Sequence, residues 1–329
     1  MLPNRLLILL ALILAPCAAR AADEPLKLPE PKPLNPGHKV VLLFPLGHPA
    51  LKALEGPDQQ ETWTLGKDGH VTKVNNINNP SIELYLAPPD KANGMSVILS
   101  PGGGNKDLWV GPEGVDVANW LNTLGVSCFV HRYRLKPYGS ATDALAETQR
   151  AVRIVRANAK EWNIDPNKIG HMGFSAGGEQ TARLALTFDA GKPDAADPID
   201  RVSSRPDFMI LGYPVITLKD PYAHKGSRTY LLGENPDPSL VALLSNETQV
   251  TKDTPPTFLV HTSNDRTVPV ENSIMFYQAL HAAGVPAEMH IFESGPHGFG
   301  LGTGNPVLST WPAMLANWLR ARGLLSAGG

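Results

Sequence analysis

A serine in a glycine-rich turn is the strongest candidate for chemistry in this sequence. Ser175 lies in the run GFSAG (173–177), which is followed at once by Gly178. The apolar stretch 168–172 predicts a buried strand before the turn, and residues 179–188 have helical spacing after it. Glycines relieve backbone crowding in so sharp a turn, while the helix N-terminus directs free N–H groups at developing negative charge. The pattern therefore predicts an exposed, nucleophilic serine hydroxyl.

A serine nucleophile needs a base to take its proton, and the expected chain order is Ser, acid, His. His297 lies in a glycine-flanked loop directly after the predicted strand 287–292. The other histidines after Ser175 lie in predicted strands, on a helix or before the last strands; they are His224, His261, His281 and His290. We therefore expect His297 to be the base, the alternative being a loop histidine without a catalytic role.

The base in turn needs a carboxylate that holds it in one tautomer. Asp265 follows the predicted strand 257–261 by a few residues, where the acid is expected. Glu288 lies within a predicted strand, Glu271 can stabilise the start of its helix, and Glu293 is the alternative acid. Asp265 is thus the predicted acid, and an Asx turn or helix cap is its alternative role.

An oxyanion hole requires backbone N–H groups near the reacting carbonyl. We expect one from Ala176, after the nucleophile, and another from the glycine-rich loop 101–105 that follows the predicted strand 95–99. Within that loop Gly103 and Gly104 are equal candidates. The loop lacks the Lys-Ser/Thr of a phosphate-binding loop and a correctly spaced GxGxxG, and no HExxH or paired-cysteine spacing indicates a metal site. No cofactor or metal is therefore expected.

The first 21 residues have the pattern of a signal peptide. Arg5 precedes the apolar run 6–15, and Ala19-Arg20-Ala21 fits a small-residue cleavage site. The run is shorter than the roughly 20 residues that span a bilayer, so no integral membrane segment is expected in the mature chain. Cys17 suggests a lipoprotein signal only weakly, because Pro16 fits that pattern poorly. We expect an exported protein, periplasmic or secreted.

The charge balance argues against a nucleic-acid partner. The chain has 29 basic and 31 acidic side chains, and loss of Arg5 and Arg20 with the signal leaves 29 − 2 = 27 basic ones, a net charge of 27 − 31 = −4. No basic stripe that could neutralise phosphates is visible. Cleavage also leaves Cys128 as the single cysteine, which excludes an intramolecular disulfide. Because it lies in the apolar run 126–130, we expect a buried thiol.

Strands alternate with helices along most of the chain, which predicts a mostly parallel sheet covered on both faces. The predicted strands are 40–44, 82–87, 95–99, 126–130, 168–172, 208–211, 257–261 and 287–292, and the predicted helices are 115–124, 141–162, 179–188, 270–283 and 308–320.

Less regular segments complete the domain organisation. A proline-rich arm is expected at 22–37, ahead of a single domain at 38–323. Within that domain, 45–80 is expected to have little regular structure, and 213–255 is a possible cap insertion.

These motifs together resemble the α/β-hydrolase superfamily, and more closely the exported bacterial esterases described as xylanase-like or acetyl xylan esterases. The resemblance covers roughly residues 38–322. Its motifs are SPGGGN (100–105), EGVDVANWLNTLG (113–125), GFSAGGE (173–179), LLGENPDP (231–238), TPPTFLVHTSNDRTVPVENS (254–273) and FESGPHGFG (292–300). Asn264 departs from the family pattern, in which a second aspartate is expected beside the catalytic one.

The resemblance implies the α/β-hydrolase fold and a serine carboxylic-ester hydrolase. In that reaction His297, oriented by Asp265, deprotonates Ser175, which attacks an ester carbonyl, and water hydrolyses the acyl-enzyme. The implied substrate is a short acyl group, such as acetyl, on a plant polysaccharide such as xylan. Candidates for the substrate pocket are Trp109, Tyr222 and Tyr230.

Other functions remain open at this point. A feruloyl esterase or general carboxylesterase uses the same residues and differs in pocket width. A serine peptidase of the prolyl-oligopeptidase type shares the order of the catalytic residues but usually carries an additional propeller domain, for which 329 residues leave no room. A non-catalytic binding module of the same fold is expected to have lost a catalytic residue.

Overall fold

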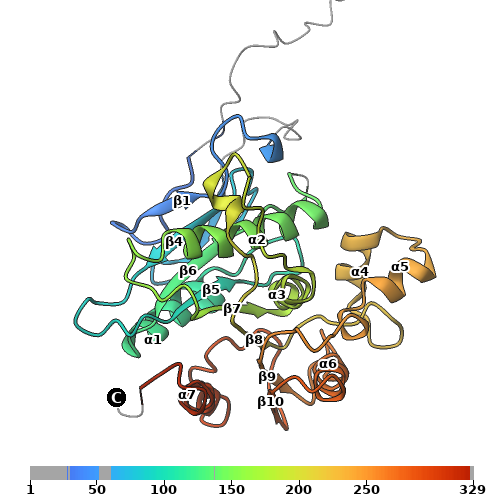
Figure 1. The fold of residues 1–329 in the computed structure, drawn as a ribbon. Helices are drawn as coiled ribbons and strands as arrows, with labels where there is room; N and C mark the ends of the chain where they lie inside the picture. Colours follow the sequence, from blue (N-terminus) through green and yellow to red (C-terminus); the bar gives the residue numbers. More distant parts are fainter. Residues whose placement is uncertain (1–27, 29, 52–60, 137, 327–329) are drawn as a thin grey trace, which may run out of the picture.

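An eight-stranded sheet forms the centre of the protein (Figure 1). The computed structural model describes residues 28, 30–51, 61–136 and 138–326. The predicted signal peptide at 1–21 and residues 22–27 and 29 of the predicted arm therefore lie outside the described residues. The strand order is β1-β4-β6-β5-β7-β8-β9-β10. The strands are β1 (Val40–Leu42), β4 (Ser81–Tyr85), β5 (Ser96–Ser100), β6 (Ser127–Arg132), β7 (Ile169–Phe174), β8 (Phe208–Gly212), β9 (Thr257–Thr262) and β10 (Ala287–Phe292).

The sheet is parallel from β6 to β10 and antiparallel where β4 joins β1 and β6. The longer helices between these strands are α1 (Asp116–Thr123), α2 (Ala141–Ala157), α3 (Ser175–Thr187), α6 (Glu271–Ala282) and α7 (Trp311–Ala321). The predicted alternation of strands and helices is confirmed. In the described part of the chain, no helix is both long and apolar enough to cross a bilayer.

Successive side chains of each central strand enter different hydrophobic layers, because strand side chains alternate between the two faces. In β5, Val97 and Leu99 pack in the layer under α1 and α7, whereas Ile98 packs in the layer under α2. The second face continues under α3 and α6, with Met209 and Leu211 of β8. Both faces are therefore covered, which explains why the central strands read as continuous apolar runs.

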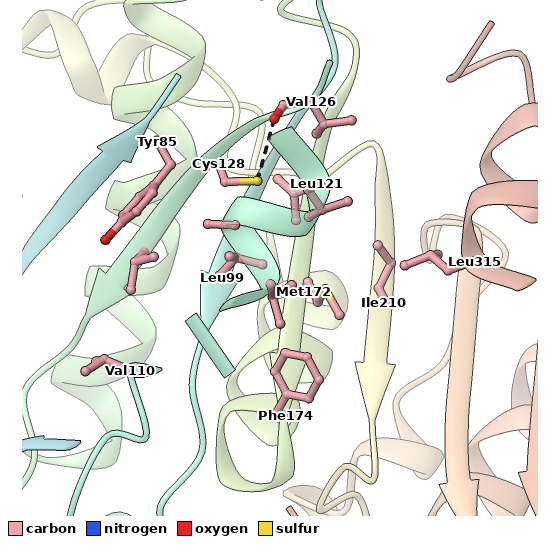
Figure 2. Close-up of a cluster of buried hydrophobic side chains, with 14 of the residues drawn as sticks. Tyr85, Leu99, Val110, Leu121, Val126, Cys128, Met172, Phe174, Ile210 and Leu315 are labelled. Carbon is pink, nitrogen blue, oxygen red and sulfur yellow. Dashed lines mark hydrogen bonds between the residues drawn. The ribbon is translucent and has the colours of Figure 1, made fainter. Parts of the chain in front are cut away.

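The first of these layers brings side chains from distant parts of the chain together (Figure 2). Leu99, Met172 and Ile210 come from neighbouring strands, and Leu121 of α1 and Leu315 of α7 pack over them. Cys128 is buried in the same layer as a free thiol, as the sequence predicted, and burial raises its pKa well above the usual value.

The prediction of little regular structure at 45–80 is wrong. The antiparallel strands β2 (Thr62–Leu65) and β3 (Val71–Asn75) form a hairpin, and η1 (Pro49–Leu51) is a short 3-10 turn. Most of β2 is exposed, so its side chains lack the apolar alternation that marks a half-buried strand. The hairpin packs beside the glycine-rich loop through a bridge between Val74 and Leu108.

Helix α2 ends at Ala157, earlier than the predicted Trp162. The side-chain amide of Asn158 donates to the carbonyl of Ile154 at 2.8 Å, and Asn163 adopts a positive φ of 54°. Trp162 is nevertheless buried, at 6% exposure. The apolar spacing therefore continues past the end of the helix, which explains why the predicted helix was too long. Shorter elements outside the main framework are α4 (Lys225–Leu232), α5 (Pro238–Leu243), η3 (Pro198–Arg201), η4 (Asn246–Thr248) and η5 (Leu308–Thr310).

Candidate active site

The turn between β7 and α3 has the geometry that its glycines predicted. Ser175 adopts a positive φ of 51°, and at 7% exposure it is buried rather than exposed as predicted, although it lines a cavity. A Cβ atom at Gly173 would lie 2.2 Å from the carbonyl oxygen of Gly177, and one at Gly177 would lie 2.0 Å from that of Ser100. Only glycine allows the backbone to pass this closely. The serine is thus held in a strained conformation at the start of a helix.

Ser175, His297 and Asp265 form a continuous chain of hydrogen bonds. His297 Nε2 lies 2.8 Å from Ser175 Oγ, and His297 Nδ1 lies 2.6 Å from Asp265 Oδ2. The three residues follow β7, β9 and β10, which are parallel strands, so their carboxyl ends meet at one edge of the sheet. The structure therefore brings together the predicted nucleophile, base and acid in the geometry of general-base catalysis.

Asp265 is held as a carboxylate by several donors. Its Oδ1 accepts hydrogen bonds from the N–H groups of Thr267 at 2.8 Å and Val268 at 3.0 Å. Its Oδ2 faces both His297 and His261 Nε2, the latter at 3.3 Å. Burial by itself raises the pKa of Asp265, but the hydrogen bonds from His261, His297 and Val268 outweigh it and hold the pKa well below its usual range. Asp265 therefore stays ionised in the folded protein at moderate pH.

Asn264, where the resemblance led us to expect a second aspartate, joins the acid loop to the histidine loop. Its Oδ1 accepts a hydrogen bond from the N–H of Gly295 at 2.9 Å. Gly295 comes two residues before His297 in the same loop. The departure from the pattern therefore removes a charge beside Asp265 but keeps an acceptor for this loop.

A buried glutamate that was not predicted as a site residue from the sequence contacts the glycine-rich loop. Glu113 is 4% exposed and belongs to the π-helical turn η2 (Gly111–Val115) that leads into α1. Its Oε2 accepts from the N–H of Gly102 at 2.7 Å, and its Oε1 accepts from the hydroxyl of Tyr213 at 2.9 Å. That hydroxyl in turn accepts from the N–H of Gly300 at 3.0 Å. Glu113 thus connects the glycine-rich loop, through Tyr213, to the loop that carries the base.

Burial raises the pKa of Glu113, while the donors Gly102 and Tyr213 and the charge of His297 act in the opposite direction. The sequence signal for such a residue is weak, because a glutamate just before an amphipathic helix usually stabilises its N-terminus. Only the folded chain shows that this carboxylate is buried.

The contact with Glu113 also decides which N–H groups remain free at the glycine-rich loop. Gly102 donates to the glutamate, whereas the N–H groups of Gly103, Gly104 and Ala176 have no protein acceptor among the described residues. Gly103 adopts a φ of 138°, and a Cβ there would lie 2.0 Å from the carbonyl oxygen of Asp107. The loop therefore keeps its donors available close to Ser175, as an oxyanion hole requires.

A cavity of about 230 Å³ opens in front of Ser175 and His297. On the side of the glycine-rich loop it is lined by Gly103, Gly104 and Trp109. The indole of Trp109 is 43% exposed, and Lys73 Nζ lies 5.0 Å from its ring centroid.

His224 and Thr267 also line the cavity. Tyr222 and Tyr230, the other predicted pocket residues, are not among the residues that line it. Tyr222 is 36% exposed, and burial raises the pKa of Tyr230 to about 12. Across the described ranges, no group of three or more His, Cys, Asp or Glu side chains is placed to hold a metal ion.

Comparisons with known proteins give a consistent set of relatives. Residues 82–280 match the model of the BD-FAE family. The chain is 36% identical to an acetylxylan esterase of Xylanibacter ruminicola over 71% of this chain and 47% of that protein. It is 37% identical to endo-1,4-beta-xylanase B of Butyrivibrio fibrisolvens over 67% of this chain and 34% of that protein. The chain thus spans from about a third to about half of the length of these curated relatives.

A solved structure extends the similarity over nearly a whole protein. The acetyl ester-xyloside bifunctional hydrolase of Caldicellulosiruptor lactoaceticus superimposes with a TM-score of 0.74 and is 39% identical, covering 88% of this chain and 97% of that one. A TM-score of this size over most of both chains shows that the two proteins share one fold.

Proposed function

The chain belongs to the BD-FAE family of esterases with the α/β-hydrolase fold, and on that basis we propose that it is a serine carboxylic-ester hydrolase that removes acetyl groups from xylan or a related plant polysaccharide. The observation that carries the proposal is the hydrogen-bonded chain from Ser175 through His297 to Asp265, beside backbone N–H groups without protein acceptors. In this proposal these residues are the catalytic triad.

The geometry supports a two-step acyl transfer. His297 Nε2, 2.8 Å from Ser175 Oγ, accepts the hydroxyl proton as the oxygen attacks the ester carbonyl. Asp265 stabilises the imidazolium that forms. The N–H groups of Ala176 and of Gly103 or Gly104 receive the negative charge that develops on the carbonyl oxygen. His297 then protonates the departing alcohol.

The second step reverses these roles with water as the nucleophile. His297 takes a proton from water, the hydroxide attacks the acyl-serine, and acetate leaves as Ser175 regains its proton. One ester and one water thus yield one acetate, one proton and one alcohol, and the enzyme returns to its starting state.

The size of the cavity supports a short acyl group. At about 230 Å³ it is smaller than the roughly 300–1,000 Å³ of typical ligand pockets. The names of the relatives, an acetylxylan esterase and an acetyl ester-xyloside hydrolase, favour acetyl on a xylose-based polymer. The exposed indole of Trp109 offers a sugar a flat apolar surface at the rim.

The domain organisation and the cellular location of the protein are part of the same proposal. We propose that residues 38–323 form one catalytic domain, that 213–255 is its cap, and that the signal peptide at 1–21 exports the enzyme to the periplasm or the medium. A polymeric substrate outside the cell is consistent with export. The cap proposal is supported by His224, which comes from this segment and lines the cavity.

Hydrolysis of p-nitrophenyl acetate, butyrate and octanoate, measured beside acetate release from acetylated xylan, tests the function. We expect preference for the acetate ester, release from xylan, and loss of both in Ser175→Ala. Turnover of the small esters without acetate release from xylan would support the catalytic triad but contradict the proposed carbohydrate substrate. No serine-dependent activity on any ester would favour a binding module.

A double variant tests whether the residues act as a unit. Ser175→Ala and His297→Ala each remove the same proton transfer, so the double variant should lose little more activity than either single one. Losses that multiply would contradict a shared mechanism.

A further inference from the structure

A histidine outside the proposed triad lies on the wall of the cavity. His224 precedes α4, in the segment 213–255, and lines the cavity together with Ser175 and His297. It is half-buried. His224 comes too early in the chain to be the expected base, so its place in the cavity requires a different explanation.

The hydrogen bonds of His224 determine which ring nitrogen carries the proton. The backbone N–H of Ser227 donates to His224 Nδ1 at 3.2 Å and caps the first turn of α4, and Ser227 Oγ lies 2.9 Å from the same nitrogen. A backbone N–H is always a donor, so Nδ1 must be the acceptor and the neutral ring carries its hydrogen on Nε2.

The neutral form is also the favoured one. Burial lowers the pKa of His224, and the charge of His297 lowers it further, while Asp265 has the opposite effect. Among the described residues, no protein atom accepts a hydrogen bond from Nε2. His224 therefore presents a single N–H donor whose direction is set by the helix that it caps.

The position of His224 points to the alcohol part of the ester. His297 delivers its proton to the departing alcohol, so the alcohol must lie beside His297 during the reaction. His224 lines the same small cavity as His297, and the exposed Thr267 lines it too. The glycine-rich loop, by contrast, holds the carbonyl oxygen. A sugar alcohol would bring hydroxyl and ring oxygens to the donor, whereas a simple aryl alcohol would not.

We propose that the Nε2–H of His224 donates a hydrogen bond to an oxygen of the sugar that carries the ester, and thereby selects sugar esters over simple esters. This inference rests on the proposed function. A buried or half-buried donor that loses its acceptor disfavours the wrong substrate, which is how such a group contributes specificity.

Two substitutions of His224 separate its role as the cap of α4 from its role as a hydrogen-bond donor. In His224→Asn, the side-chain oxygen replaces Nδ1 as the cap of α4, since asparagine is a good N-cap, but the donor at the Nε2 position is lost. In His224→Gln, the amide nitrogen can reach the Nε2 position instead. Asp237→Ala is the matched control, because Asp237 caps α5 in the same segment through the N–H of Ser239 at 2.7 Å and does not line the cavity.

The measurement is kcat/KM for partly acetylated xylo-oligosaccharides divided by kcat/KM for p-nitrophenyl acetate. We expect this ratio to fall about tenfold in His224→Asn, the amount that one hydrogen bond contributes. It should recover in part in His224→Gln and remain at the wild-type value in Asp237→Ala. Thermal unfolding of each variant reports whether the cap is intact.

Different results would contradict the role of His224 and the proposed carbohydrate esterase function. An unchanged ratio in His224→Asn, or an equal fall in Asp237→Ala, would show that His224 only supports the segment. Wild-type protein that hydrolyses p-nitrophenyl acetate through Ser175 but releases no acetate from the oligosaccharides would reject the carbohydrate substrate, and the role of His224 with it.

Discussion

Glu113 accepts a hydrogen bond from the N–H of Gly102 at 2.7 Å, which places a buried glutamate beside the proposed oxyanion hole, where it also lines the cavity. A negative charge so close to a developing oxyanion would oppose catalysis. Here its oxygens are engaged by Gly102 and by the hydroxyl of Tyr213. Burial also raises the pKa of Glu113, which disfavours the charged form of this carboxyl group beside the oxyanion hole.

Replacing this carboxylate should reduce turnover more than substrate binding. In Glu113→Ala, the N–H of Gly102 and the hydroxyl of Tyr213 lose their acceptor, and we expect kcat to fall about tenfold to a hundredfold because the loop donors shift. Glu113→Gln keeps an acceptor for Gly102 and should retain more activity. Steady-state kinetics with p-nitrophenyl acetate measures both variants. If Glu113→Gln loses as much as Glu113→Ala, the charge matters rather than the acceptor.

The two glycines of the loop should differ in their tolerance of a side chain. A Cβ at Gly103 would lie 2.0 Å from the carbonyl oxygen of Asp107, whereas a Cβ at Gly104 meets nothing within 4 Å. Gly103→Ala must displace the loop, so we expect a loss of about a hundredfold or more in kcat. Gly104→Ala faces only the cost of its φ of 63° and should lose less. Equal losses would show that space around the loop is not the limiting factor.

Asn264 allows a test of charge beside the triad. Asn264→Asp keeps the acceptor for Gly295 and adds a negative charge, which favours the protonated, inactive form of His297. The acid limb of the pH profile of kcat/KM should therefore move to higher pH, by about 0.3 units for so exposed a position, and 1 M salt should reduce the shift. Asn264→Ala removes the acceptor without adding charge and should lower kcat at all pH values. A shift in the alanine variant would contradict the electrostatic explanation.

A buried histidine in the sheet should make stability depend on pH. Burial lowers the pKa of His131 from 6.5 to about 3, and its Nδ1 lies 3.1 Å from Ser100 Oγ. Between these values the unfolded chain binds a proton that the folded chain does not, so this residue stabilises the fold above pH 6.5 and loses that contribution as pH falls toward 3. His171, also buried and with a lowered pKa, acts in the same direction.

The contribution of His131 can be isolated by comparison with a variant. Glu147, whose pKa burial raises to about 7, changes stability with the opposite sign over part of this range, so the wild-type curve is a sum. His131→Asn should flatten the decline in the free energy of unfolding between pH 7 and pH 4, as measured by urea denaturation at each pH. Parallel curves for the two proteins would show that His131 does not contribute.

Local sequence patterns were sufficient to predict the central strands and most helices, and to select the candidate triad residues. Apolar runs in the central strands and the glycines around Ser175 follow from constraints that act within a few residues. The loop positions of Asp265 and His297, each after a predicted strand, then limited the candidates, and the structure brings these side chains within hydrogen-bonding distance. The hairpin β2–β3 was missed because its exposed strands lack such a pattern.

The tertiary structure alone decided what surrounds these residues. The contacts of Glu113 with Tyr213, of Asn264 with Gly295, and the place of His224 in the cavity join segments that are far apart in the chain. Sequence periodicity reports whether a side chain faces the core, but it carries no information on which distant polar group meets it there. Partners of buried polar groups depend on the packing of the whole sheet and its loops, so they became visible only in the folded chain.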